Sequence, residues 1–130
     1  MGISKSQFAA DDTNKALRKE GGKFLKTLRA RAGLTQRDLA ELVGLRYYTF
    51  LSQLESGAGR VPPQLYSKLA EHLGVDEKEF VFTLLMFYDP HTYKCLRGPV
   101  TRKIDWDALY QTQTVGAEGN GDTAGNRRKK

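Results

Sequence analysis

The chain has 130 residues, of which 39% are hydrophobic and 28% are charged, and its formal net charge is +6 at pH 7. This length fits one ordinary globular domain and excludes a large two-domain enzyme. The positive charge favours a polyanionic partner, although by itself it does not choose among DNA, RNA and an acidic membrane.

The sequence predicts neither a membrane span nor a secretion signal. Its longest apolar run, residues 80–88, is interrupted by Thr83 and is much shorter than the roughly 20 residues that cross a bilayer. The N-terminal segment MGISKSQFAADD contains no apolar core of a signal peptide. The single cysteine, Cys95, can neither form an internal disulfide nor hold a zinc ion alone. We therefore expect a cytoplasmic protein that makes no contact with a membrane.

Most of the chain is predicted to be helical. Residues 1–13 are polar and aperiodic, which predicts a flexible N-terminal arm. Residues 111–130 are rich in glycine and end in four cationic residues, which predicts a disordered basic tail. A C-terminal extension over residues 89–110 precedes this tail. Between the arm and the extension, apolar residues recur at helical spacing and predict five helices, over residues 14–32, 36–43, 47–55, 62–73 and 77–88.

The ends of several predicted helices carry recognisable residues. The two glycines at residues 21–22 could break the first helix in two. Thr35, followed three residues later by Asp38, approximates a capping box at the start of the second helix. Residues 76–79 open the fifth helix in a similar way, and the Asp-Pro pair at residues 89–90 stops it.

The second and third predicted helices are short and are joined by a tight turn at Gly44, whose backbone can adopt the left-handed conformation. Positive charge is concentrated in the same region. Residues 22–60 contain seven basic and three acidic residues, a net charge of +4, whereas residues 61–99 contain four basic and five acidic residues, a net charge of −1. Two short helices around a glycine turn in a basic helical domain indicate a helix-turn-helix.

The stretch over residues 24–75 resembles the Cro/cI-type helix-turn-helix family, often called XRE regulators. The segments that carry the resemblance are FLKTLRARAGLTQRDLAELVGL, LSQLESG and PPQLYSKLAEHLGV. The resemblance implies an all-α, five-helix, lambda-repressor-like DNA-binding domain over residues 14–88, to which we add a helical C-terminal extension. It also implies binding to operator DNA, usually as a dimer.

The resemblance further implies positions that contact phosphates or support the fold. Gln36, at the start of the second helix, matches a glutamine that holds a phosphate and braces the recognition helix. Arg60 matches a phosphate-contacting position in the loop after the third helix. Arg29 and Glu55 match a pair that, in some members, forms an internal salt bridge between the first and third helices. The basic residues that we consider for phosphate contact are Lys23, Lys26, Arg31, Arg37 and Arg60.

The third predicted helix is the recognition helix. Tyr48, Thr49 and Gln53 match base-reading positions of the family, and Tyr47 stands at the start of the helix. A glutamine can pair bidentately with adenine, and a threonine offers both a hydroxyl and a methyl group. The predicted DNA-binding residues are Gln36, Arg37, Arg46, Tyr47, Tyr48, Thr49, Ser52, Gln53 and Arg60.

The turn before the recognition helix is one residue longer than in the family pattern. Ten residues lie between Gly44 and Glu55, where the common pattern has nine. A forward count from the glycine would bury Phe50 and Gln53, whereas a backward count from the glutamate buries Leu51 and Leu54. We prefer the backward count, because leucine suits a core better than glutamine does.

Three aromatic residues, Tyr47, Tyr48 and Phe50, fall within four positions at this turn. Two interpretations stay open for each of them. The rings can fill the enlarged turn and the core, or they can stack on sugars and methyl groups of DNA.

The fifth predicted helix is apolar nearly all round, because eight of the nine residues in FVFTLLMFY are apolar. Such a helix needs cover on more than one side. A second protomer can provide it, which predicts a homodimer with residues 80–110 as the dimerisation element and two recognition helices roughly 34 Å apart. The chain's own extension can also provide it through Tyr93, Leu96, Val100, Ile104, Trp106, Leu109 and Tyr110.

Catalysis and metal binding have little support. His91 and Cys95 are four residues apart, as in half a metal site, but no further ligand accompanies them. No nucleophile and base stand together in a motif, and the glycines of the tail match no phosphate-binding loop. We therefore predict a sequence-specific, double-stranded DNA-binding transcriptional regulator without enzymatic activity, metal or cofactor. Two alternatives stay open: an antitoxin-like module that also binds a protein partner, and a nonspecific nucleic-acid-binding protein.

Overall fold

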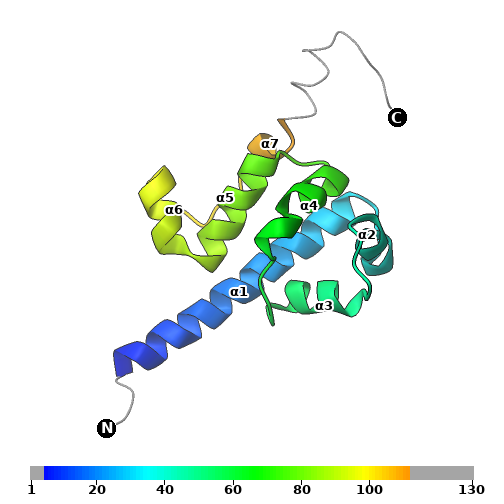
Figure 1. The fold of residues 1–130 in the computed structure, drawn as a ribbon. Helices are drawn as coiled ribbons and strands as arrows, with labels where there is room; N and C mark the ends of the chain where they lie inside the picture. The colour runs from blue at the N-terminus through cyan, green and yellow to red at the C-terminus, as the bar shows by residue number, and fades with distance from the viewer. Residues whose placement is uncertain (1–4, 112–130) are drawn as a thin grey trace.

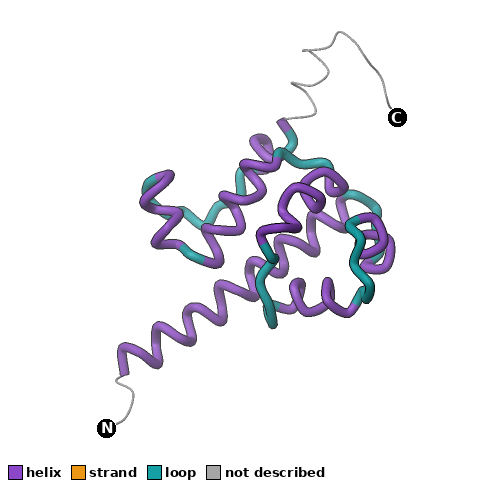
Figure 2. Tube along the Cα trace, in the orientation of Figure 1, coloured by secondary structure: helices purple, strands orange, loops and turns teal. Residues whose placement is uncertain are grey.

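The computed structural model describes residues 5–111, with side chains from residue 13 onward. Within these residues the chain forms seven α-helices, one short 3-10 helix and no strand (Figure 1, Figure 2). The prediction of an all-α fold with a helical C-terminal extension is confirmed. None of the described helices is long and apolar enough to cross a membrane. In chain order the elements are α1 (Lys5–Arg31), α2 (Gln36–Leu42), α3 (Thr49–Ser56), η1 (Pro63–Leu65), α4 (Tyr66–Leu73), α5 (Glu77–Tyr88), α6 (Pro90–Arg97) and α7 (Trp106–Leu109).

The first helix, α1, is longer than predicted. It begins at Lys5 instead of at about residue 14, and it runs without interruption through the two glycines at residues 21–22. Residues 5–13, predicted to be a flexible arm, are helical, because they include two alanines and contain no proline that would stop a helix. The rest of the predicted arm and residues 112–130 of the predicted tail lie outside the described residues. Figure 1 shows the N-terminal half of α1 projecting from the globule that the other helices form.

The two glycines within α1 let neighbouring helices approach it closely. A Cβ atom at Gly22 would lie 2.2 Å from the carbonyl oxygen of Glu55 in α3, which is far inside any non-bonded contact distance. A Cβ atom at Gly21 would lie 3.0 Å from Cε1 of Tyr88 in α5. Glycine therefore helps to set the spacing of α1 from both α3 and α5.

The predicted caps are present at the starts of α2 and α5. The Thr35 hydroxyl accepts a hydrogen bond from the Asp38 N–H, and the Asp38 carboxylate accepts one from the Thr35 N–H, both at 3.0 Å. At the start of α5, the Asp76 carboxylate accepts a hydrogen bond of 3.0 Å from the N–H of Glu79. These bonds satisfy backbone donors that the first turn of a helix leaves without a partner.

The core lies where α1, α3, α4 and α5 meet, and Phe24 of α1 is at its centre. The centroid of the Phe24 ring lies 6.2 Å from that of Phe80, 6.3 Å from that of Phe87 and 6.1 Å from that of Trp106. Burial of each such side chain stabilises the fold by about 1.5–3 kcal/mol relative to exposure. The other largest fully buried side chains are Leu28, Leu51, Leu54, Val61, Leu69, Leu84 and Leu109.

Asp89 lies between α5 and α6 and serves both helices. It is the C-cap of α5, and its carboxylate accepts hydrogen bonds from the N–H and the hydroxyl of Thr92 in the first turn of α6. Pro90 takes the first position of α6, where a missing N–H costs nothing. At the other end of α6, Arg97 donates two hydrogen bonds to the carboxylate of Glu79 in α5. Both ends of α6 are therefore attached to α5.

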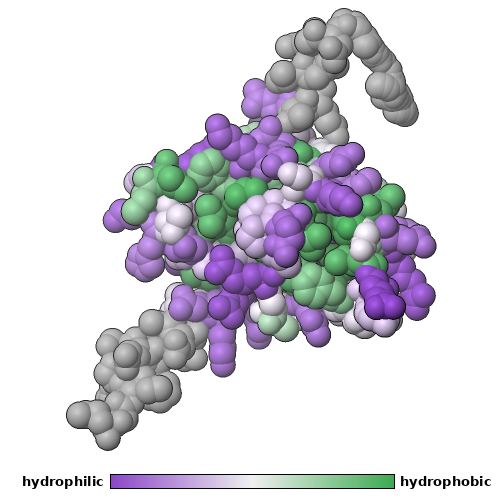
Figure 3. Space-filling model, in the orientation of Figure 1, coloured by the Kyte–Doolittle hydropathy of each residue, from purple (hydrophilic) through white to green (hydrophobic). Residues whose placement is uncertain are grey.

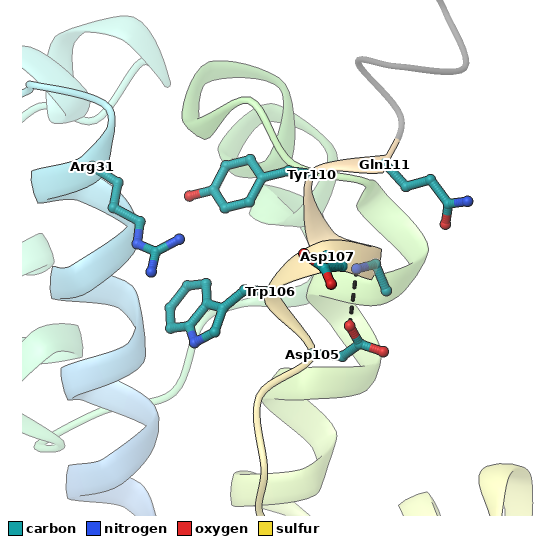
Figure 4. A pocket seen from close by; sticks show the side chains of 7 residues that line it. Arg31, Asp105, Trp106, Asp107, Tyr110 and Gln111 are labelled. Atoms are coloured by element: carbon teal, nitrogen blue, oxygen red, sulfur yellow. Dashed lines mark hydrogen bonds between the residues drawn. The ribbon is translucent and has the colours of Figure 1, made fainter.

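The last helix, α7, returns to α1 and closes the core. Leu109 is fully buried, and its carbonyl oxygen accepts a hydrogen bond of 2.6 Å from the N–H of Asp76. Trp106 packs against Phe24 and lies under Arg31, whose guanidinium carbon is 3.8 Å from the centre of the indole ring. Figure 4 shows Arg31 reaching from α1 toward the rings of Trp106 and Tyr110 across this junction.

The extension supplies cover for α5 within a single chain. Every apolar residue of α5 is at least half-buried, so a second protomer is not needed to cover this helix. Leu96, predicted to contribute to the cover, is instead 62% exposed on α6. On the face drawn in Figure 3, polar side chains interrupt the apolar ones.

Candidate nucleic-acid interface

Residues 43–48 form the turn between α2 and α3. Gly44 adopts the left-handed conformation, with φ of 79°, which a larger residue would adopt only with strain. The N–H of Leu45 donates a hydrogen bond of 2.8 Å to the carbonyl oxygen of Ala40, which closes α2. A Cβ atom at residue 44 would lie 3.9 Å from the ammonium nitrogen of Lys68 in α4. Lys68 is thus a cation beside the turn that sequence reasoning missed.

The third helix, α3, begins at Thr49, later than the predicted start at Tyr47. Tyr48 is the N-cap, but its side chain accepts no hydrogen bond from the backbone. The first hydrogen bonds of the helix run from the N–H of Phe50 to the carbonyl oxygen of Tyr47 and from the N–H of Ser52 to that of Tyr48. Both tyrosines therefore stand at the N-terminal end of α3.

The recognition helix has a buried face and an exposed face. Leu51 and Leu54 are 1% and 0% exposed, whereas Thr49, Ser52 and Gln53 lie on the surface. The backward count is therefore confirmed, and the forward count, which would bury the glutamine, is wrong. Within the described part of the chain, the side chains of the three surface residues make no hydrogen bond to the protein. The hydrogen bonds that the Ser56 hydroxyl and the Ala58 N–H donate to Gln53 reach its backbone carbonyl oxygen, not its side chain. Their polar groups are available to an external partner.

Glu55 connects three helices through one carboxylate. Arg29 of α1 donates from Nε to Oε2 at 2.7 Å and from Nη2 to Oε1 at 3.0 Å. Gln36 of α2 donates from Nε2 to Oε1, also at 3.0 Å. A third donor of Arg29, Nη1, reaches the carbonyl oxygen of Leu34 in the loop between α1 and α2 at 2.9 Å. Because the side chain of Glu55 is only 5% exposed, this network fixes α2 and α3 relative to each other.

Arg29 acts within this network and not on the surface. Its hydrogen bonds to Glu55 are the largest effect on its pKa, which they raise; burial opposes the rise, and the charge of Glu55 adds to it. The guanidinium therefore stays charged at any ordinary pH, and its side chain is only 14% exposed. An arginine held in this way supports the recognition helix from behind.

Residues 22–80 match the sequence model of a protein family that is described as a helix-turn-helix domain. These residues form a helix-turn-helix domain. The match begins within α1, ends within α5 and includes all of α2, the turn and α3. The domain indicates DNA binding and belongs to a class that is typically not catalytic. A search of curated proteins finds none that matches the chain.

Two of the three aromatic residues at the turn of the helix-turn-helix domain lie on its surface. Tyr47 is 66% exposed and Tyr48 is 39% exposed, so the core-packing interpretation is wrong for both. Phe50 is half-buried and packs against the core. The guanidinium carbon of Arg37, in the first turn of α2, lies 4.6 Å from the centre of the Tyr48 ring, and that of Arg46 lies 5.8 Å from the centre of the Tyr47 ring. Each of the two exposed tyrosines at the start of α3 therefore has an arginine beside its ring.

A second group of cations lies where α3 ends. Arg60 is exposed, and its guanidinium carbon is 5.0 Å from the centre of the Tyr88 ring. Burial raises the pKa of Tyr88, and the nearby charges of Arg60 and Arg18 partly oppose the rise. Gly57, the C-cap of α3, approaches the backbone of Lys19 so closely that a Cβ atom would lie 2.9 Å from its Cα atom. Arg18 and Lys19 are not identified from the sequence, because they precede residues 22–60, over which the positive charge is concentrated.

The other basic candidates lie elsewhere in the helix-turn-helix domain. Arg31 stacks on Trp106 on the side of α1 that meets α7 (Figure 4), so the structure does not bring it to α3. Lys23 forms a surface ion pair of 3.3 Å with Glu20, and Lys26 is exposed.

His91 and Cys95 are both exposed on α6. Over residues 13–111, whose side chains the structure describes, no group of three or more histidine, cysteine, aspartate or glutamate side chains is placed to hold a metal ion.

Proposed function

We propose that the chain is a sequence-specific, double-stranded DNA-binding transcriptional regulator that reads its operator with α3. The observation that carries this proposal is the division of α3 into two faces. Thr49, Ser52 and Gln53 are exposed and make no side-chain hydrogen bond within the described residues, while the opposite face is buried and held by Glu55. A rigid helix with polar groups on its outer face can enter the major groove and pair with base edges there.

Each exposed residue of α3 has a chemistry that base edges can use. Gln53 can donate to N7 and accept from the N6 amino group of an adenine. Thr49 offers a hydroxyl for a base edge and a methyl group for a thymine methyl, and the hydroxyl of Ser52 can pair with several bases. These three residues are the proposed determinants of hydrogen-bonded sequence recognition.

Phosphate contacts would supply most of the affinity and its dependence on salt. Arg37 stands in the first turn of α2, and Arg60 stands after α3, so the two cations flank the recognition helix. Gln36 is the second proposed phosphate ligand on α2, through the second N–H of Nε2, because the first donates to Glu55. Arg46, in the turn, can reach either a phosphate or a guanine.

We further propose that two copies of the chain bind one palindromic operator. The eight residues of α3 form a rod of about 12 Å, which covers only about three to four base pairs of a groove. So few base pairs discriminate poorly against the competing sites of a genome. A homodimer whose two α3 helices lie roughly 34 Å apart would read two half-sites and meet this requirement.

The proposal is tested by selecting duplexes from a random pool with the full chain. We expect one palindromic motif with half-site centres about 10 base pairs apart. A single short motif without symmetry would contradict the dimer. Equal affinity for selected and scrambled duplexes would contradict sequence-specific binding and favour the nonspecific alternative. A small protein that co-purifies tightly with the chain would instead support the antitoxin-like alternative.

The proposed function places the protein with the DNA it regulates, in the cytoplasm at the nucleoid. It requires no enzymatic activity, metal or cofactor, because recognition needs only hydrogen bonds, apolar contacts and cations.

A further inference from the structure

Tyr47 is the most exposed large hydrophobic side chain in the described part of the chain, at 66%. It lies immediately before α3, and its carbonyl oxygen accepts the hydrogen bond from Phe50 that starts the first turn of the helix. In a helix-turn-helix, the N-terminal residues of the recognition helix are those that contact base edges. The ring therefore has no packing role in the core. It lies at the end of the helix whose residues contact base edges in a helix-turn-helix.

The neighbouring aromatic residues have other contacts. Tyr48 is less exposed, and its ring lies beside the guanidinium of Arg37 with a separation of 4.6 Å. Phe50 is half-buried and packs against the core. Only the ring of Tyr47 is left mainly to solvent, with Arg46 loosely beside it at 5.8 Å. The ring of Tyr47 is therefore free to contact an external partner at the start of α3.

The major groove offers an aromatic ring one apolar group. Base edges there present hydrogen-bond donors and acceptors, and thymine also presents its C5-methyl group. A ring brought to the floor of the groove by α3 would therefore contact this methyl group and distinguish thymine from cytosine, which lacks it. The cation of Arg46 beside the ring would stay close to the phosphates at the edge of the groove.

We propose that Tyr47 is a specificity-determining residue that recognises the methyl group of a thymine in each half-site. This inference rests on the proposed function, because it requires that α3 reads double-stranded DNA. It adds to the hydrogen-bonding residues of α3 a contact that depends on shape and apolarity alone.

The test replaces each thymidine of a selected operator, one at a time, by deoxyuridine, which removes only the methyl group. For the full wild-type chain we expect the affinity to fall about fourfold at one position of each half-site, as expected for the loss of one buried methyl group. At that position the Tyr47→Ala variant should bind the thymidine and deoxyuridine duplexes equally well. Sensitivity that persists there in Tyr47→Ala, or its absence at every position in the wild type, would overturn the inference.

Two matched variants exclude other sources of the effect. Tyr47→Phe keeps the ring and removes the hydroxyl, so it should retain the full response to deoxyuridine. If it instead weakens binding to all duplexes alike and deoxyuridine has no effect, the tyrosine binds a phosphate through its hydroxyl and the inference is wrong. Thr49→Ser removes the other methyl group on this face and should keep the response; loss of the response there would assign the thymine contact to Thr49.

Failure of the inference can be told apart from failure of the proposed function. If the wild-type chain selects no duplex at all, the proposed function fails. If it selects an operator but shows no response to deoxyuridine, only the role of Tyr47 fails. Because Tyr47 packs against nothing in the core, urea unfolding of Tyr47→Ala should match that of the wild type, so that any change in DNA binding is not caused by unfolding.

Discussion

The Glu55 carboxylate belongs to α3 and receives hydrogen bonds from Arg29 of α1 and Gln36 of α2. A buried carboxylate of this kind is costly to desolvate, and it is tolerated because its charge is paired and both of its oxygens accept hydrogen bonds. The resulting network supports the recognition helix from its inner side, while the outer side stays available. Residues on the inner face of α3 thus hold the helix in place, and residues on its outer face are left to bind a partner.

We expect Glu55→Ala to destabilise the fold by about 3 kcal/mol, because it leaves the charge of Arg29 nearly buried and without a partner. Urea unfolding followed by circular dichroism measures this loss. Glu41→Ala, which removes an exposed carboxylate from α2, is the control and should change stability by less than about 0.5 kcal/mol. The double variant Arg29→Ala/Glu55→Ala should lose less than the sum of the two single variants. Strict additivity would show that the two side chains do not interact.

Gln53 and Arg60 should respond differently to substitution, because one is proposed to read a base and the other a phosphate. Gln53→Ala should relax the preference at one or two base pairs, at a cost of roughly 1–3 kcal/mol for the preferred site. Arg60→Ala should weaken binding to all sequences about equally and reduce the slope of log affinity against log salt by about 1. Fluorescence anisotropy with operator and scrambled duplexes at several salt concentrations measures both effects. Identical behaviour of the two variants would contradict the assignment.

At the scale of whole elements, the contact between α1 and α3 depends on how close their backbones come. Gly22 faces the last turn of α3 with no room for a side chain, and the backbone carbonyl of Glu55 occupies the space that a Cβ atom would need. The same glutamate carries the carboxylate that binds Arg29. The close approach and the ion pair therefore support each other, because the pair can form only at this spacing.

We expect Gly22→Ala to destabilise the protein by at least about 2 kcal/mol, although alanine favours helix more than glycine does. The reason is that its Cβ atom would lie 2.2 Å from a backbone oxygen, which must move. Gly59→Ala is the matched control, since the nearest atom to its Cβ would be a leucine Cδ2 at 3.7 Å, an ordinary contact distance. Thermal unfolding of the two variants compares them directly. Equal melting temperatures would contradict the steric argument.

The capping box of α2 predicts a dependence of stability on pH. The hydrogen bonds from the N–H and the hydroxyl of Thr35 hold the pKa of Asp38 below its ordinary value. A carboxyl whose pKa is lower in the folded state stabilises the fold above the unfolded pKa, and this stabilisation is lost as the pH falls through the folded pKa. The difference in unfolding free energy between the wild type and Asp38→Asn should therefore shrink between about pH 5 and pH 2. A difference that is constant over this range would show that the capping carboxylate does not titrate as expected.

The start of a helix could be predicted from the sequence where a side chain caps it, and could not where no side chain does. The capping residues Thr35 and Asp76 gave the starts of α2 and α5 correctly. The start of α3 was placed too early, because Tyr48 caps the helix without a side-chain hydrogen bond and so leaves no trace in the sequence. The Asp-Pro pair at Asp89 and Pro90 predicts the end of α5, but the same two residues also open α6.

At the candidate site, the burial of a side chain could be predicted where it depends on helical periodicity, but not where it depends on contacts with distant parts of the chain. The spacing of Leu51 and Leu54 identifies the buried face of α3, and the outer face is the one opposite to it. The exposure of Tyr47 could not be predicted, since a tyrosine suits both a core and a surface. Arg31 could not be separated from the other arginines of α1 without knowing that Trp106, far along the chain, stacks against it.

At the scale of the whole molecule, the C-terminal extension and the helix-turn-helix domain share one core. Leu109 is buried to the same degree as the leucines of α3 and α4, and the carbonyl of this residue binds the N–H of Asp76 at the start of α5. Trp106 extends the aromatic cluster around Phe24. The extension is therefore a structural part of the fold that supports the helix-turn-helix.

Two leucines of the extension provide a test of this view. Leu109→Ala should destabilise the whole fold by about 3 kcal/mol, because it leaves a cavity in the shared core. Leu96→Ala, in α6, removes a side chain that is 62% exposed and should change stability by less than about 0.5 kcal/mol. Urea unfolding measures both variants. If Leu109→Ala loosened only the C-terminal end and left the main unfolding transition unchanged, the extension would be a separate unit.

The chain contains a single tryptophan, and the fold has set it beside a guanidinium at 3.8 Å in the segment that closes the core. Figure 1 shows α7, which begins with this residue, at the end of the molecule away from α3. The intrinsic fluorescence of this tryptophan therefore reports, without a label, whether α7 is packed against α1. Binding of a dye-labelled oligonucleotide at α3 can be followed in the same sample through the signal of the dye. The two signals then report separately on the two ends of the protein.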